Sequence, residues 1–153
     1  MVDQESPLLE VGAELIGPTR TFTLARRRWY SAGLRTAATG NVSQPMMGGI
    51  HDDYEYARGQ GMKAPIIDGM TVTNWCSSLL LQHFGLDYVG AGDLRTKYIR
   101  PTYMDESVTV RAKVLSITPE SSGGQRYELD VWCENQDGVK VTDGHATIVK
   151  AAA

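Results

Sequence analysis

Residues 68–85 read DGMTVTNWCSSLLLQHFG and carry the clearest periodicity in the chain. Their apolar side chains recur at the i, i+3, i+4, i+7 and i+8 spacing of one helical face, and they are Val72, Trp75, Cys76, Leu79 and Leu80. The opposite side is polar but uncharged, which is rare for a helix that faces solvent over several turns. We therefore predict a helix that begins at about residue 68, is enclosed on most sides and ends at Gly85.

The segments after this helix have the period of two that is typical of half-buried strands. Apolar and polar residues alternate over 108–115 and 126–133, and further strands are expected over 93–100 and 139–149. Turn-forming residues separate 108–115 from 126–133, and 126–133 from 139–149. We predict a four-stranded antiparallel meander after the helix. A strand near 19–24 would complete the sheet, and a second helix is expected over 25–36.

A strongly twisted sheet wrapped around the helix satisfies both patterns, because the inner face of such a sheet covers a helix on several sides. The expected fold class is therefore α+β, with a strongly curved antiparallel sheet around one long central helix, the arrangement called the hot-dog fold. The 153 residues, 42% of them hydrophobic, suffice for one domain over 1–153. We expect its ends, about 1–8 and 151–153, to be frayed.

Charge and composition disfavour several classes of partner. Lys and Arg number 15 against 18 Asp and Glu, so nucleic acid and anionic membranes are not expected partners. The first residues lack a basic leader and a long apolar run, which makes the cytoplasm the expected location. Cys76 and Cys133 lie far apart in the sequence without a partner motif, so we expect reduced core thiols rather than a disulfide or a metal site.

Several ordered motifs link this sequence to a known family. Residues 51–57 read HDDYEYA, residues 61–70 read GMKAPIIDGM, residues 98–101 read YIRP, and residues 135–144 form a closing N-Q-x-G hairpin. This combination resembles the MaoC-like (R)-specific enoyl-CoA hydratases and dehydratases over roughly the whole chain. The resemblance implies the hot-dog fold and a homodimer or dimer-based oligomer. It also implies an acyl thioester substrate, carried on coenzyme A or an acyl carrier protein, and no separate cofactor.

The resemblance also implies where the chemistry takes place. In that family, a paired aspartate and histidine hold the water, and backbone N–H groups at the start of the central helix polarise the thioester carbonyl. His51 is the expected general acid/base, since imidazole titrates near neutral pH. Gly69 and Met70 are the expected oxyanion donors, because the start of a helix favours negative charge.

The sequence departs from the family pattern at the catalytic pair. Asn41 replaces the family's aspartate, and an amide can bind water or the thioester but cannot take a proton. An insertion before His51 contains Met46 and Met47, which form either an adaptable wall of the acyl pocket or a longer surface loop. Asp68 replaces the histidine of the family's H-G-M element. It either restores an acid–histidine pair with exchanged positions or simply caps the helix.

The remaining charged residues carry less specific signals. The basic run 26–28 is more readily a solvated helix face than a contact for a coenzyme A phosphate, and Arg100 is an open candidate for such a contact. Asp53 fits a position expected to brace its loop, and Asp52 is expected to be solvated. We assign no catalytic role to His83 or His145.

Three kinds of function remain open from the sequence. The first is an acyl-thioester hydratase or dehydratase of the 2-enoyl to 3-hydroxyacyl type with an altered catalytic pair. The second is a non-catalytic or divergent hot-dog subunit that binds an acyl thioester or a related small molecule, or catalyses a biosynthetic dehydration or isomerisation. The third is thioester hydrolysis, for which Asp68 is the candidate carboxylate.

Overall fold

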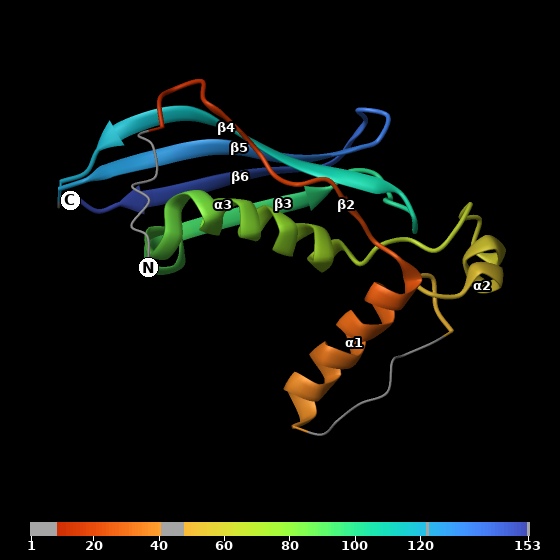
Figure 1. Cartoon of the computed structure of the whole chain (residues 1–153). Coiled ribbons are helices and arrows are strands. Elements are labelled where there is room, and N and C mark those ends of the chain that lie inside the picture. Colours follow the sequence, from red (N-terminus) through yellow and green to blue (C-terminus); the bar gives the residue numbers. More distant parts are fainter. Residues whose placement is uncertain (1–8, 41–47, 122, 153) are drawn as a thin grey trace.

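A computed structural model describes residues 9–40, 48–121 and 123–152 (Figure 1). The elements in chain order are β1 (Glu14–Ile16), β2 (Arg20–Thr21), α1 (Leu24–Thr39), α2 (Tyr54–Gly59), α3 (Gly69–Ala91), β3 (Gly92–Tyr98), β4 (Ser107–Pro119), β5 (Gln125–Asn135) and β6 (Lys140–Lys150). Within these ranges, no helix is long and apolar enough to cross a membrane. Asn41, Met46 and Met47 lie outside the described residues.

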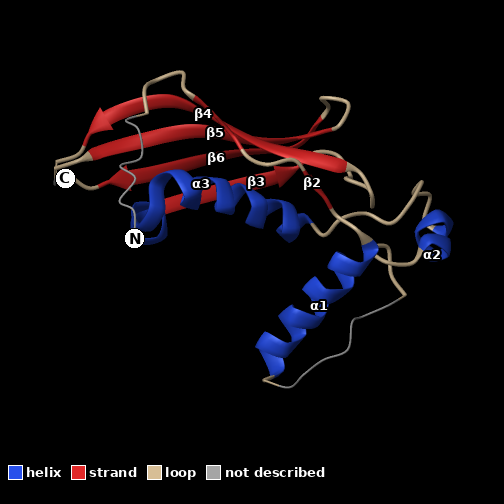
Figure 2. Cartoon of the chain, viewed as in Figure 1, coloured by secondary structure: helices blue, strands red, loops and turns tan. Residues whose placement is uncertain are grey.

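The described strands form one antiparallel sheet that curves over the long helix α3 (Figure 2). The strand order is β1-β4-β5-β6-β3, and β2 pairs with β4 next to β1. Helix α3 contacts β3, β4, β5 and β6, whereas α1 extends away from the sheet. This arrangement confirms the expected hot-dog fold.

The core lies between α3 and the inner face of the sheet. The alternation predicted for the strands is confirmed, because one residue in two is buried and faces the helix; these are Val108, Val110, Ala112 and Val114 on β4 and Tyr127, Leu129, Val131 and Cys133 on β5. Cys76 of α3 and Cys133 of β5 are free and buried, and their sulfur atoms lie 3.5 Å apart. Their hydrogen bond and burial raise the pKa of the Cys133 thiol.

The predicted four-stranded meander is wrong. Only β4, β5 and β6 pair in chain order, while β3 pairs with β6, from Gly92 opposite Ile148 to Tyr98 opposite Thr142. The outer edge of β4 is instead occupied by β1 and β2. Local pattern shows that a segment is a strand but does not show which edge it joins, and neighbours in sequence pair only about two-thirds of the time.

The predicted enclosure of the central helix is also wrong for the single chain. The sheet covers one face of α3, and the other face exposes Met70 and Leu81, at 56% and 46%. Leu86, which follows Gly85, is 84% exposed. Gly85 interrupts the helix with φ 56° and ψ −133°, but the helical conformation resumes and continues to Ala91. Gly85 therefore ends the first of two helical segments, as expected, and the second segment follows directly after the kink.

Candidate active site

His51 lies in the turn before α2, and backbone hydrogen bonds attach this turn to the segment that leads into α3. The Ile66 N–H donates to the Ile50 carbonyl oxygen (3.0 Å), and the Ile66 carbonyl lies 2.9 Å from His51 Nδ1. Because a carbonyl oxygen only accepts hydrogen bonds, Nδ1 carries the proton in this contact. In the neutral imidazole, Nε2 is then the nitrogen that can accept a proton.

Asp68 immediately precedes α3, and its carboxylate lies between the imidazole of His51 and the guanidinium of Arg27. Oδ1 is 4.0 Å from His51 Nε2, and Oδ2 is 3.6 Å from the guanidinium of Arg27. Its side chain makes no capping hydrogen bond, although its backbone oxygen accepts the Thr71 N–H (3.0 Å). Helix capping therefore does not account for the carboxylate, which instead faces the histidine.

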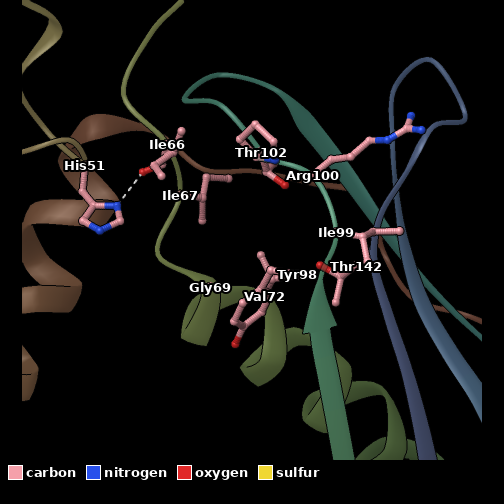
Figure 3. Close-up of a pocket in the computed structure, with 11 residues that line it drawn as sticks. His51, Ile66, Ile67, Gly69, Val72, Tyr98, Ile99, Arg100, Thr102 and Thr142 are labelled. Atoms are coloured by element: carbon pink, nitrogen blue, oxygen red, sulfur yellow. Dashed lines mark hydrogen bonds between the residues drawn. The ribbon is translucent and has the colours of Figure 1, made fainter. Parts of the chain in front are cut away.

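A cavity of about 340 Å³ opens beside His51 (Figure 3). It lies between the segment before α3, the start of α3 and the end of β3, and its lining is mostly apolar, with Ile66, Ile67, Val72, Ile99 and Pro101 beside the polar Thr102 and Thr142. Gly69 also lines it, whereas the side chain of Met70 is largely exposed. Arg100 lies at its edge, and its side chain extends away from His51 in Figure 3. The volume is in the range of small-ligand pockets.

Tyr98 at the end of β3 covers the start of α3. A Cβ added to Gly69 would lie 2.5 Å from Tyr98 Cε2, so the ring packs where only glycine leaves space. The Tyr98 hydroxyl is 2.7 Å from Thr73 Oγ1 and donates to Met70 Sδ at 3.9 Å, which places the ring over the helix start. The first N–H groups of an α-helix have no partner within the helix, so this region offers donors to a ligand.

The structure also tests the surroundings that the sequence predicted for three other charged residues. Asp52 is buried, not solvated, because its Oδ1 accepts the Gly49 N–H (2.9 Å) within the turn. Asp53 caps α2 by accepting the Tyr56 N–H (2.9 Å), which confirms its bracing role. Arg27 is buried, so the interpretation of the whole basic run as a solvated face is wrong.

The remaining histidines lie apart from this cavity. Burial lowers the pKa of His83, which is half-buried on α3. His145 is exposed on β6, opposite Arg95 and Asp130 on the neighbouring strands. Among the described residues, no group of three or more His, Cys, Asp or Glu side chains could hold a metal ion.

No protein-family model and no curated protein matches the chain. Solved structures do match it over nearly its whole length. The (R)-hydratase from A. caviae involved in PHA biosynthesis is 20% identical, with a TM-score of 0.70 and coverage of 95% of this chain and 99% of that chain. A MaoC-like dehydratase from Rhodospirillum rubrum is 21% identical, with a TM-score of 0.70 and coverage of 95% and 94%.

The ChsH1-ChsH2 complex from Mycobacterium tuberculosis is also similar, at 15% identity, a TM-score of 0.69 and coverage of 94% of this chain and 99% of that chain. The chain therefore has the hot-dog fold of MaoC-like hydratases and dehydratases, which confirms the fold expected from the motifs in 51–70 and 98–101.

Proposed function

We propose that the protein is an acyl-thioester hydratase or dehydratase that interconverts 2-enoyl and 3-hydroxyacyl thioesters, with His51 and Asp68 as its catalytic pair. The observation that carries this proposal is the 4.0 Å separation of Asp68 Oδ1 and His51 Nε2 beside an apolar cavity that begins at the start of α3. Similarity to hydratase and dehydratase structures supports the same class of reaction.

The separation of the two groups suits a bound water. It is too long for a direct hydrogen bond, and one water oxygen can lie at hydrogen-bond distance from both His51 Nε2 and Asp68 Oδ1. His51 takes a proton from this water as the oxygen bonds to C3 of the enoyl group. Asp68 accepts the second hydrogen bond of the water and stabilises the imidazolium that forms.

The electron pair of the C2=C3 bond moves toward the thioester, and negative charge develops on the carbonyl oxygen. The N–H groups of Gly69 and Met70 at the positive end of α3 stabilise this oxyanion. The proton on His51 Nε2 then passes to C2, which completes the addition of water. Dehydration follows the same steps in reverse.

Several parts of the proposal extend beyond the described site. We propose that Asn41 binds the water or the thioester, that Met46 and Met47 border the acyl group, and that Arg100 contacts the carrier phosphate. The carrier is coenzyme A or an acyl carrier protein, and no separate cofactor is needed. A homodimer or dimer-based oligomer is the proposed assembly, by analogy with a fold relative that was solved as a two-protein complex. The cytoplasm remains the predicted location.

The test is the hydration of a panel of trans-2-enoyl-CoA substrates, followed as loss of the absorbance of the conjugated thioester. We expect His51→Ala and Asp68→Asn to lose about two orders of magnitude in kcat or more, the scale of a lost acid/base group. His145→Ala is the matched control, because His145 is exposed on β6, away from the cavity, and should keep wild-type activity.

The same assay separates the other functions. A silent wild type together with a gain of activity in Asn41→Asp would contradict the proposal and favour a binding subunit that has lost this chemistry. Release of free thiol from an acyl-CoA would indicate thioester hydrolysis, with Asp68 as the attacking or activating carboxylate.

A further inference from the structure

Arg27 is a buried cation that the chemistry described so far does not use. It lies in the first turn of α1, where its N–H donates to the Thr23 carbonyl oxygen (3.0 Å) and its side chain is only 9% exposed. The adjacent Arg26 is exposed and donates from its guanidinium to the Thr21 carbonyl oxygen (3.2 Å). The two neighbours in one basic run therefore have different surroundings.

The guanidinium of Arg27 faces Asp68 of the proposed catalytic pair. A guanidinium remains charged at all accessible pH values, and burying a charge is costly unless an opposite charge compensates it. Arg27 approaches Asp68 Oδ2 at 3.6 Å, and the carboxylate of Asp68 is itself only 32% exposed. The carboxylate therefore lies between a permanent cation on one side and the imidazole of His51 on the other.

This arrangement constrains the direction of the carboxylate. Because a carboxylate is planar and rigid, holding Oδ2 toward Arg27 also sets the direction in which Oδ1 faces His51. Without the arginine, Asp68 would be free to rotate onto a protonated His51 and form a close ion pair. Such a pair would close the 4.0 Å space that a water occupies in the proposed reaction.

We propose that Arg27 is a positioning residue that holds Asp68 separate from His51 and pointed at the same water. The proposal rests on the hydratase function proposed above and adds a third member to its pair. Arg27 supplies a compensating charge to Asp68 from the first turn of α1, in addition to the positive end of α3 that Asp68 precedes. Its effect acts through Asp68 and involves no contact with the reacting atoms.

The kinetic test compares Arg27→Ala and Arg27→Lys with wild type, and uses Arg26→Ala as the matched control from the same helix turn. We expect Arg27→Ala to lower kcat by about 10- to 100-fold while KM changes little, as for a misplaced catalytic group. The kcat of Arg27→Lys should lie between those of wild type and Arg27→Ala, because lysine keeps the charge but lacks the planar guanidinium. Non-denaturing guanidinium chloride should restore part of the activity of Arg27→Ala, and equal concentrations of urea or sodium chloride should not.

A second measurement tests the pairing without reference to activity. Urea unfolding midpoints are measured for wild type, Arg27→Met, Asp68→Asn and the double variant. We expect Arg27→Met to lower the midpoint and the added Asp68→Asn to recover part of the loss, because the carboxylate left without its cation is removed. Additive effects would overturn the pairing.

The outcomes distinguish the two proposals. A wild type that hydrates enoyl-CoA, with folded Arg27 variants that keep its kcat or show no guanidinium rescue, would overturn the positioning role and leave the proposed function intact. An inactive wild type would overturn the proposed function and the positioning role of Arg27 together. The unfolding cycle would then still decide whether Arg27 and Asp68 are paired.

Discussion

Replacement of Gly69 by alanine tests how the start of α3 and Tyr98 share space. The added Cβ would lie 2.5 Å from Tyr98 Cε2 and 2.6 Å from Cζ. Carbon atoms pack best at about 3.5–4.0 Å, so the ring must retreat by about 1 Å or more. The ring is 48% exposed and can move outward, but its hydroxyl then loses the 2.7 Å contact with Thr73 Oγ1.

The expected cost in stability is small, whereas the expected cost in activity is large. Loss of one hydrogen bond costs about 0.5–1.5 kcal/mol of unfolding free energy. Alanine in place of a helical glycine returns up to about 1 kcal/mol. The net change should therefore stay within about 1 kcal/mol. Activity should fall by about 100-fold, because the displaced ring disturbs the helix start to which the proposed reaction assigns the thioester carbonyl.

The measurements are urea unfolding and initial rates of enoyl-CoA hydration. Gly90→Ala is the control within the same helix, because a Cβ at Gly90 meets nothing within 4 Å, and it should keep full activity. Adding Gly69→Ala to Tyr98→Ala should have almost no further effect, since the clashing ring is absent. The reasoning would be refuted if Gly69→Ala kept wild-type activity, or if its effect were the same with and without Tyr98.

Three further predictions concern the core and its titrating groups. Leu80→Ala should lower the unfolding free energy by about 2–5 kcal/mol in urea titrations, since Leu80 is 0% exposed, whereas Leu86→Ala, at an 84% exposed site, should change it by less than about 0.5 kcal/mol. Burial lowers the pKa of His83, so the unfolded chain binds a proton at this imidazole more readily than the folded chain. The unfolding free energy should therefore fall as the pH drops through about 6.5, and more steeply in the wild type than in His83→Gln. Cys76 and Cys133 should resist a thiol reagent in the native protein and react fully in denaturant, because both are buried and the Cys133 thiol has a raised pKa; rapid native reaction would contradict this.

The strands could be predicted well from local pattern, but their pairing could not. Alternating burial over 108–114 and 127–133 follows from side chains that point to opposite faces of a strand, which any half-buried sheet requires. The partner of β3 depends instead on where the chain runs after Tyr98. Because β1 and β2 occupy the free edge of β4, β3 lies beside β6.

The candidate site shows the same division between residue type and placement. His51 and Asp68 could be singled out because an imidazole and a carboxylate are the groups that proton transfer needs, and neighbouring motifs resemble a family that uses such a pair. Arg27 could not be singled out, since a run of three arginines ordinarily indicates a solvated helix face. Its burial depends on how the first turn of α1 meets the residue before α3.

The residue order alone therefore contains the periodicities, turns and chemical groups of this protein, because these depend on neighbours within a few positions. The triad of Arg27, Asp68 and His51 joins α1, the start of α3 and the turn before α2. Tyr98 contacts Gly69 from the end of β3. Such contacts join segments that are distant in the sequence and pack around one core, so only the tertiary structure determines them.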